Sequence, residues 1–310
     1  MPEHTLEGYR LALDLGADAL ETDVVLTGDG ELVCRHDCEL SDTTDVASRA
    51  EFAGRKTVKC IDGETAEGWF IDDFTLAEVQ TLRARQRFAF RDRSFDGQFA
   101  IPTLGELIDL VASDDAKTGR RPGLVVEIKH AAYFDTVGKS MADTIGDTLG
   151  RYRDTPPPIW IECFEVDVLR RLRRKISAPI IQLVDAPNMR PADVAAAGGS
   201  LTFGDMIAPG GLGQIAGYAS GIGAWKELIL PRAPVAGTVG RQKYAGCTSL
   251  IADAHRIGLS VHAWTFRSES YFLTVEDEDD PSKEYRRFAA LDLDGFITDD
   301  PDAAAKALLR

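Results

Sequence analysis

The chain has 310 residues and a formal net charge of −15, from 35 lysines and arginines against 50 aspartates and glutamates. A chain this acidic lacks the basic face that nucleic-acid binding requires, and it is poorly suited to docking on anionic lipid. No stretch approaches the roughly 18 apolar residues of a membrane span, so we expect neither nucleic-acid partners nor stable membrane insertion. Five cysteines without a C-x-x-C pair argue against a disulfide scaffold or a zinc ribbon.

Apolar, strand-like runs alternate with helical patterns along the chain. Strands are predicted over residues 19–27, 31–36, 123–129, 158–164, 179–184, 221–224, 260–266 and 295–298. Several of these runs are continuously apolar, which is typical of parallel strands buried on both faces. Thr75 and Thr103 begin capping boxes of helices, and Asp300-Pro301 begins a C-terminal helix over 302–310. The alternation predicts an α/β fold with a parallel sheet, open or closed into a barrel.

Charged side chains interrupt two of the apolar strands near their carboxyl ends. Glu21 and Asp23 are two residues apart and therefore point to the same face of a strand, and Glu127 and Lys129 repeat this arrangement. Burial of a carboxylate is costly unless a partner or a metal compensates it. Converging carboxylates at barrel strand ends are typical of a Ca²⁺ or Mg²⁺ site. A buried ion pair between neighbouring strands is the alternative.

His36 ends the second predicted strand and is followed by Asp37. A histidine at this position is a candidate general acid or base, because its pKa is near neutrality, and Asp37 could orient it. A satisfied structural histidine is the alternative. Later in the chain Trp264 and Arg267 end a strand, where an indole could wall a ligand site and a guanidinium could meet an anion. A core indole and a surface arginine are the alternatives.

In their order these motifs resemble the glycerophosphodiester phosphodiesterases, in particular their long, bacterial, calcium-dependent branch. The segments that carry the resemblance are Pro2-Glu3-His4-Thr5-Leu6-Glu7, Glu21-Thr22-Asp23, Leu32-Val33-Cys34-Arg35-His36-Asp37, Glu127-Ile128-Lys129, Glu162-Cys163-Phe164, Gln182-Leu183, His262-Ala263-Trp264-Thr265-Phe266-Arg267 and Asp294-Gly295-Phe296-Ile297-Thr298-Asp299. Each segment alone is a weak signal, whereas the ordered set is specific.

The resemblance implies a TIM (β/α)8 barrel of the phosphodiesterase type, with a single domain over 1–310 and a small insertion over 41–100 after the His-Asp strand. It also implies hydrolysis of small glycerophosphodiesters, of the glycerophosphocholine or glycerophosphoethanolamine type, to glycerol 3-phosphate and an alcohol. By resemblance, catalysis uses acid/base histidines and a divalent cation, with Ca²⁺ expected rather than Mg²⁺. The oligomeric state leaves no trace in the pattern.

The resemblance also implies roles for individual side chains. The catalytic residue is His36, the metal ligands are Glu21, Asp23 and Glu127, the substrate-binding residues are Lys129, Gln182 and Trp264, and residues with a supporting or unassigned role are Glu3, Asp37, Phe164 and Arg267.

One family motif is missing at the start of the chain. The family has a His-Arg-Gly at the end of its first barrel strand, a few residues before the segment that begins here at Pro2. We expect a truncated chain whose first strand and other catalytic histidine precede Met1. The alternatives are a catalytically silent barrel that binds a phosphodiester or calcium, and a chain in which another residue replaces the missing histidine. As written, the sequence has no signal peptide and predicts a cytoplasmic protein, whereas a leader upstream of Met1 would predict a periplasmic or secreted one.

Overall fold

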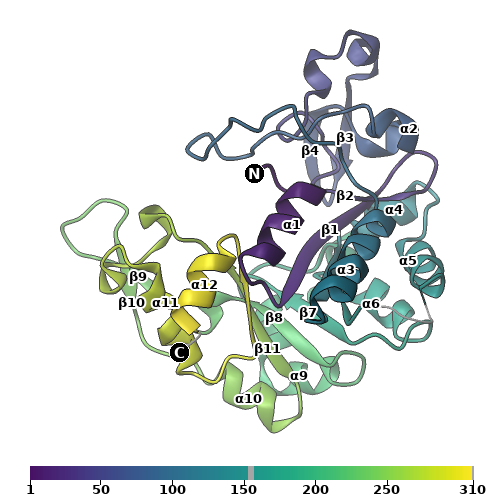
Figure 1. The fold of residues 1–310 in the computed structure, drawn as a ribbon. Helices are drawn as coiled ribbons and strands as arrows, with labels where there is room; N and C mark the ends of the chain where they lie inside the picture. The colour runs from purple at the N-terminus through teal and green to yellow at the C-terminus, as the bar shows by residue number, and fades with distance from the viewer. Residues whose placement is uncertain (153–156, 309–310) are drawn as a thin grey trace. The chain divides into compact units, whose positions relative to one another are not determined.

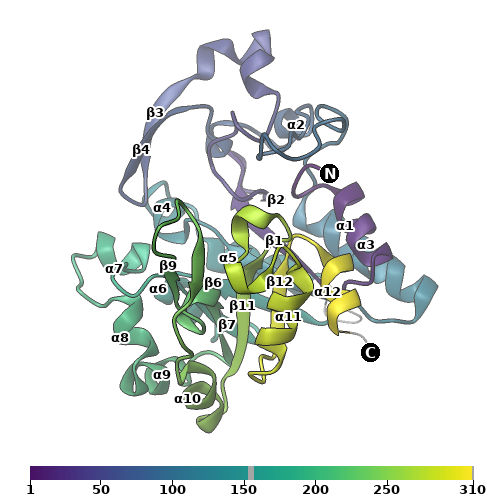
Figure 2. The ribbon, with the colours of Figure 1, turned by 90° about the vertical axis from the view of Figure 1, so that its left-hand side faces the viewer.

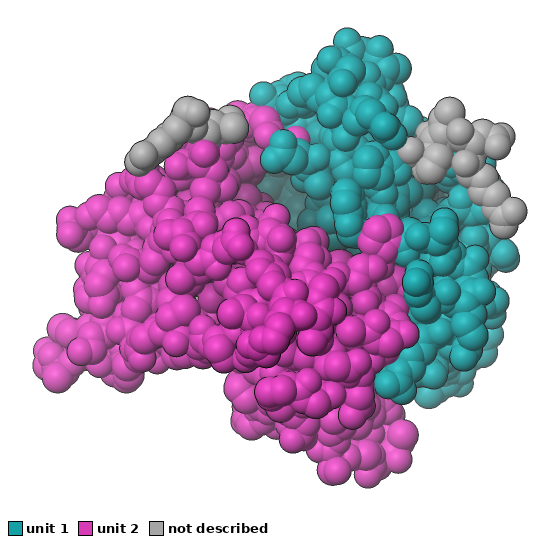
Figure 3. Space-filling model, turned by 90° about the horizontal axis from the view of Figure 1, so that it is seen from below, with its two compact units in different colours: residues 1–14, 18–178 teal, residues 15–17, 179–310 magenta. Residues whose placement is uncertain are grey.

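The computed structural model describes residues 1–152 and 157–308. The chain divides into two compact units, which Figure 3 shows in different colours. Unit 1 comprises residues 1–14 and 18–178, and unit 2 comprises residues 15–17 and 179–310.

Unit 1 contains four neighbouring strands in the order β6-β5-β1-β2. Their bounds are Ala19–Leu26 for β1, Leu32–Cys34 for β2, Gly123–Ile128 for β5 and Ile159–Cys163 for β6. The strands β1, β5 and β6 pair in parallel, so their carboxyl ends lie at one edge of the sheet. Strand β2 pairs with β1 in antiparallel fashion, because the short turn at Thr27–Glu31 returns the chain directly.

The helices of unit 1 pack against these strands. Figure 1 shows α1 and α3 close to β1, and contacts join α1 to β1 and to α3, and α3 to β2 and β5. Helix α3 begins at the predicted capping box, in which Thr103 and Glu106 cap each other's backbone N–H groups. The helix bounds are α1 Leu6–Asp14, α2 Leu76–Val79, α3 Leu104–Thr118, α4 Ala131–Thr136, α5 Met141–Gly150 and α6 Val166–Leu172.

The segment predicted as an insertion contains little regular structure besides one hairpin. Strands β3 (Thr57–Ile61) and β4 (Glu64–Gly68) pair in antiparallel fashion, and short 3-10 turns cover Val46–Ser48, Ala50–Arg55 and Ile71–Asp73. Figure 2 shows the hairpin reaching towards α4. Asp62 in its turn contacts His130 Nδ1 at 2.6 Å, which ties the hairpin to the end of β5.

Unit 2 contains four parallel strands in the order β12-β11-β8-β7. Their bounds are Ile180–Val184 for β7, Gly221–Trp225 for β8, Ser260–Phe266 for β11 and Gly295–Thr298 for β12. A small hairpin joins β9 (Arg232–Pro234) to β10 (Gln242–Tyr244), and 3-10 turns cover Lys226–Leu228, Ser270–Phe272 and Val275–Asp277. The helices are α7 Ala192–Ala196, α8 Phe203–Ile207, α9 Pro209–Ile215, α10 Leu250–Arg256, α11 Pro281–Ala289 and α12 Pro301–Leu308.

The predicted elements agree with the observed ones except near the short hairpins. Strands β11 and β12 have the predicted bounds, and β1, β5, β7 and β8 differ from prediction by one residue at one end. Strand β6 is one residue shorter at each end, and β2 is shorter by one residue at its start and two at its end. The C-terminal helix begins at Pro301, while residues 309–310 of its predicted range lie outside the described residues. Among the described residues no helix combines the length and apolarity that crossing a membrane requires.

Candidate active site

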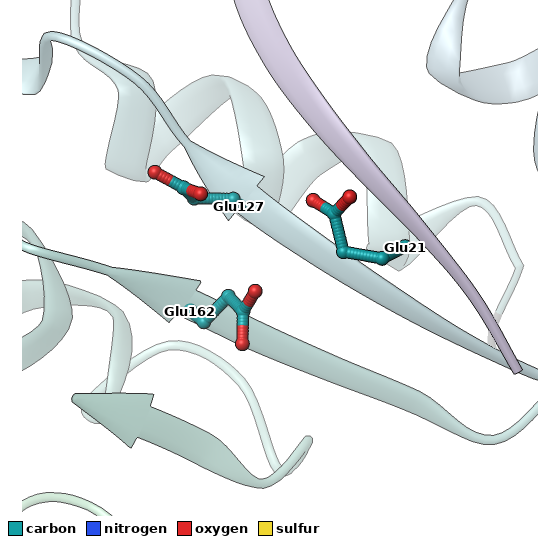
Figure 4. A group of neighbouring side chains, drawn as sticks. All are labelled: Glu21, Glu127 and Glu162. Carbon is teal, nitrogen blue, oxygen red and sulfur yellow. The ribbon is translucent and has the colours of Figure 1, made fainter. Parts of the chain in front are cut away.

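Three carboxylates from neighbouring strands of unit 1 converge at one place. Strands β1, β5 and β6 contribute Glu21, Glu127 and Glu162, and the register pairs Glu127 with Glu162. Each of the three offers a carboxylate oxygen, and these oxygens lie within 4.8 Å of one another. Figure 4 shows the three side chains directed into the same space. We call Glu21, Glu127 and Glu162 the carboxylate cluster.

The prediction of metal ligands from the sequence named Asp23 and did not name Glu162. Asp23 is the register partner of Glu127, and it shares a strand face with Glu21 because the two residues are two positions apart on β1. The intervening Thr22 accepts a hydrogen bond from Tyr9 on α1. The carboxylate of Asp23 contacts the ammonium of Lys129 and the imidazole of His4. The sequence contained a signal for Glu162, since Glu162 ends the apolar run of β6 as Glu127 ends that of β5.

Lys129 follows β5 and neutralises part of this negative charge. Its Nζ lies 2.6 Å from Glu127 Oε1 and 3.1 Å from Asp23 Oδ1, and it lies 5.8 Å from the centre of the Phe164 ring. Burial disfavours the ammonium, but these two carboxylates outweigh burial and raise the pKa of Lys129 above its ordinary value. Lys129 therefore remains a cation within the strand ends.

Burial and mutual repulsion keep the carboxylate cluster from ionising fully. Burial, together with the charges of neighbouring carboxylates, raises the pKa of Glu21 and of Glu162 well above the ordinary value. Burial also raises the pKa of Glu127 to about 7, although Lys129 acts in the opposite direction. Asp23 differs, because Lys129 and His4 outweigh its burial and hold the pKa of Asp23 well below its usual range.

This donor set fits a divalent cation. Glu162 Oε2 is buried and has no hydrogen-bond partner among the described residues. Four carboxylates, counting Asp23, surround a single ammonium, so the strand ends carry excess negative charge whenever the cluster is ionised. Carboxylate oxygens are the ligands that Ca²⁺ and Mg²⁺ prefer. The residues present could thus hold such an ion through Glu21, Glu127 and Glu162.

His36 follows β2, and one of its ring nitrogens is hydrogen-bonded to a carboxylate. His36 Nδ1 lies 2.6 Å from Asp37 Oδ1, and the side chain is 48% exposed. Burial lowers the pKa of His36, but the hydrogen bond that its ring donates to Asp37 outweighs burial, so the net shift is upward. The charges of Asp23 and Glu127 also act on His36, which places the imidazole within electrostatic range of the strand ends. His36 and Asp37 are thus in direct contact, while the catalytic role of His36 and the orienting role of Asp37 stay predictions.

His4 contacts the strand ends in a way that its sequence position did not reveal. His4 Nε2 lies 2.9 Å from Asp23 Oδ2, and its Nδ1 lies 2.7 Å from the hydroxyl of Tyr9. The sequence placed His4 only at the start of a helix, and α1 indeed begins two residues later at Leu6. The contact depends on a left-handed backbone at His4, with φ of 51°, that no spacing rule predicts.

The predicted substrate residues in unit 2 have partners within that unit. Gln182 is buried on β7 and accepts a hydrogen bond of 2.7 Å from Tyr218. Trp264 Nε1 donates to the carbonyl oxygen of Gly223 at 3.0 Å, and Arg267 Nε lies 2.9 Å from Asp299 Oδ2. Their roles towards substrate stay predictions.

Comparison with known proteins agrees with this geometry. The sequence profile of the glycerophosphoryl diester phosphodiesterase family matches residues 1–303. A glycerophosphodiester phosphodiesterase of Arabidopsis thaliana is 34% identical over 96% of this chain and 80% of its own length. A second, of Haemophilus influenzae, is 25% identical over 87% of this chain and 76% of its own length.

Solved structures show the same fold. A phosphodiesterase of Oleispira antarctica, solved with its product sn-glycerol-3-phosphate, has a TM-score of 0.63 and 20% identity, covering 99% of this chain and 91% of that one. A Silicibacter pomeroyi structure described within the same family has a TM-score of 0.70 and 24% identity, covering 100% of this chain and 89% of that one. These likenesses confirm the predicted α/β barrel type. With the family profile along nearly its whole length, the chain belongs to the glycerophosphoryl diester phosphodiesterase family.

Proposed function

We propose that this protein hydrolyses small glycerophosphodiesters to glycerol 3-phosphate and an alcohol, with a divalent cation held by Glu21, Glu127 and Glu162. The observation that carries the proposal is the convergence of three carboxylates beside Lys129, within the electrostatic range of His36; Glu127 and Glu162 are buried and Glu21 is half-buried. Family membership supports the reaction class, and the product named for the Oleispira antarctica structure supports glycerol 3-phosphate as the product.

The chain's own residues supply charge and proton transfer. A phosphodiester is an anion, and negative charge builds on its oxygens as the nucleophile attacks. Lys129 places a fixed positive charge at the strand ends, where it stabilises that charge. The cation, when bound, acts as a Lewis acid on the phosphoryl oxygens. Asp23 keeps Lys129 in place through its 3.1 Å contact.

His36 is suited to move a proton. Asp37 is a carboxylate and can only accept a hydrogen bond, so the Nδ1 of His36 carries the proton between them. The neutral imidazole then has a bare Nε2, which can take a proton from the attacking hydroxyl. The same atom, once protonated, can donate to the leaving alkoxide. A positioned acid or base of this kind is typically worth about 10²–10⁴-fold in rate.

We propose Ca²⁺ rather than Mg²⁺ as the cation. The donors are carboxylates on three separate strands, and Ca²⁺ accepts such an irregular all-oxygen shell. Mg²⁺ requires nearly ideal octahedral geometry and keeps several waters. Adding each ion to protein stripped with EDTA, and measuring both thermal stabilisation and turnover, tests this preference.

The test of the function is direct. The purified chain is stripped with EDTA, supplied with Ca²⁺ or Mg²⁺, and offered glycerophosphocholine, glycerophosphoethanolamine and a choline lysophospholipid. Glycerol 3-phosphate from the two small diesters is measured by a coupled dehydrogenase, and choline release is measured for the lysophospholipid, whose other product keeps its acyl chain. We expect cation-dependent release from the two small diesters. Thermal stabilisation by the cation without product release would instead support a silent binding protein. Release from the lysophospholipid alone would overturn the assignment of substrate.

A matched pair of variants tests the cation site. Glu162→Gln removes one buried carboxylate of the cluster, whereas Glu67→Gln removes an exposed carboxylate on β4 whose partner is Lys56. We expect cation affinity and turnover to fall for Glu162→Gln and to remain unchanged for Glu67→Gln. Equal cation affinity in the two variants would contradict the proposed ligand set.

A further inference from the structure

An arginine from the irregular part of the insertion shares a carboxylate with His36. Asp37 Oδ1 accepts from His36 Nδ1 at 2.6 Å, and Asp37 Oδ2 accepts from Arg87 Nη2 at 2.6 Å. Arg87 and Asp37 are fifty residues apart in the chain and come from different segments. Each oxygen of Asp37 therefore has its own donor, which fixes the plane of the carboxylate.

Arg87 is itself held by a second carboxylate. Its Nε and Nη2 donate to the two oxygens of Glu3 at 2.9 and 2.7 Å, in the two-point geometry that a guanidinium favours. Burial opposes ionisation of Glu3, but Arg87 outweighs it and lowers the pKa of Glu3 to about 2. His36 and Arg87 likewise outweigh burial and hold the pKa of Asp37 well below its usual range. Both carboxylates are thus ionised at neutral pH.

The backbone on either side of Arg87 is ordered by a buried glutamine. Gln86 is 6% exposed; its backbone N–H donates to Asp96 at 2.7 Å, and its side-chain amide donates to the carbonyl oxygen of Met1 at 3.1 Å. Its Oε1 accepts from the backbone N–H of Phe88 at 3.1 Å. Arg87 lies between these two residues, so its guanidinium is directed at Asp37 by a fixed loop. Groups that are oriented in this manner are typical supports of functional side chains.

We propose that Arg87 is a positioning residue for His36 and acts through Asp37. With Arg87 on one oxygen, the other oxygen of Asp37 stays on His36 Nδ1, which keeps Nε2 bare and aimed for proton transfer. Without Arg87, the carboxylate of Asp37, whose side chain is 33% exposed, can rotate into water and release the ring. This role rests on the proposed function, in which His36 transfers a proton.

A purely structural role is the competing explanation. Through Glu3, Arg87 also ties the loop over 85–100 to the N-terminal segment, so its loss could disturb the fold without any effect on His36 in particular. The two explanations differ in the effect that the loss of Arg87 has on kcat when Asp37 has already been replaced by a neutral residue. A residue that acts through Asp37 loses its effect there, whereas a structural tie does not.

The kinetic test is a double-mutant cycle with Arg87→Gln, Asp37→Asn and the double variant. We expect Arg87→Gln to lower kcat by about 10- to 100-fold, as losses of supporting partners commonly do, with KM changed less than about twofold. In the Asp37→Asn background the same change should have almost no further effect. Arg87→Lys should recover part of the loss, because the ammonium reaches one oxygen of Asp37. Full additivity, or a loss confined to KM, would overturn the proposal.

A control and a spectroscopic readout keep the test independent of turnover. Arg83→Gln removes one positive charge from the same segment. The Arg83 guanidinium donates to the carbonyl oxygens of Gln80, Thr81 and Leu82, so kcat should not change. Imidazole ¹⁵N NMR, recorded well above the pKa of His36 and assigned with His36→Ala, reports which ring nitrogen holds the proton. We expect the Nδ1–H form in the wild type and its loss in Arg87→Gln.

These outcomes separate the two proposals. If the wild type releases no glycerol 3-phosphate, the proposed function fails, and the NMR result alone decides whether Arg87 positions His36. If the tautomer is the same in the wild type and in Arg87→Gln, Arg87 does not position His36, whatever the activity.

Discussion

The metal-free protein should lose stability as the pH rises from about 4.5 to 7. Burial raises the pKa of Glu127 from 4.5 to about 7 in the folded chain, so in this window the native state binds more protons than the unfolded state. The free energy of unfolding then falls with pH. One pKa unit corresponds to about 1.4 kcal/mol, so Glu127 accounts for a loss of about 3 kcal/mol across the window. Glu21 and Glu162 act in the same direction.

Other groups near the carboxylate cluster either titrate outside this pH window or make a contribution to stability that a control variant subtracts. Asp23 has a pKa below 3.8, so the stability it provides is lost only in more acidic solution. His36 has a raised pKa, and its contribution is lost only as the pH rises through that value, above 6.5. Subtracting the profile of Glu127→Gln removes both contributions.

The assay is urea unfolding at several pH values in EDTA, for the wild type and for Glu127→Gln. We expect the wild type to lose stability relative to Glu127→Gln by about 3 kcal/mol between pH 4.5 and 7. Saturating Ca²⁺ should abolish the loss, and calorimetry in buffers of different ionisation enthalpy should show proton release on binding. Parallel pH profiles for the two proteins would refute the buried, partly protonated state of Glu127.

Three further outcomes are expected. His36→Ala should keep the cation-dependent thermal stabilisation and lose turnover by about 10²–10⁴-fold, and full turnover in this variant would remove its acid/base role. In Glu162→Gln, calorimetric titration should show weaker cation binding but no loss of metal-free stability at pH 7, because the substitution relieves repulsion. In unit 2, Glu284 lies 2.8 Å from Lys226 Nζ and 2.7 Å from Arg232 Nη2. Glu284→Gln should therefore lower the free energy of unfolding, measured with denaturant, by about 3–5 kcal/mol. An unchanged midpoint would show that Lys226 and Arg232 find other partners.

The strands could be predicted from the sequence because their signal is local. A parallel strand buried on both faces is a continuous apolar run, and both β5 and β8 show such a run over most of their length in the sequence itself. The hairpins β3–β4 and β9–β10 lack such a run, because most of their residues are exposed or half-exposed. Their place depends on contacts such as Asp62 with His130, which join segments far apart in the chain.

The candidate site shows the same limit. Glu21 and Glu127 could be found because a carboxylate inside an apolar strand is conspicuous, and Glu162 carried the same signal. Arg87 and His4 carried none, because Arg87 lies in an irregular loop and His4 precedes a helix. Their importance arises only when the fold brings Arg87 to Asp37 and His4 to Asp23.

The position of Lys129 is the reason that we propose the carboxylate cluster, rather than the sequence-predicted trio with Asp23, as the cation site. Lys129 contacts Asp23 and Glu127, and His4 contacts Asp23 as well, so Asp23 already has two cationic or hydrogen-bonding partners. Within residues 1–152 and 157–308, Glu21 and Glu162 have no cation at ion-pair distance, and burial together with the charges of neighbouring carboxylates keeps their pKa values high. A divalent ion bound there would displace protons from these two carboxylates without breaking an existing ion pair. Replacement of Asp23 by Asn should therefore lower turnover through Lys129 more than it weakens cation binding, and calorimetric titration beside the coupled assay would show the reverse if Asp23 were the principal ligand.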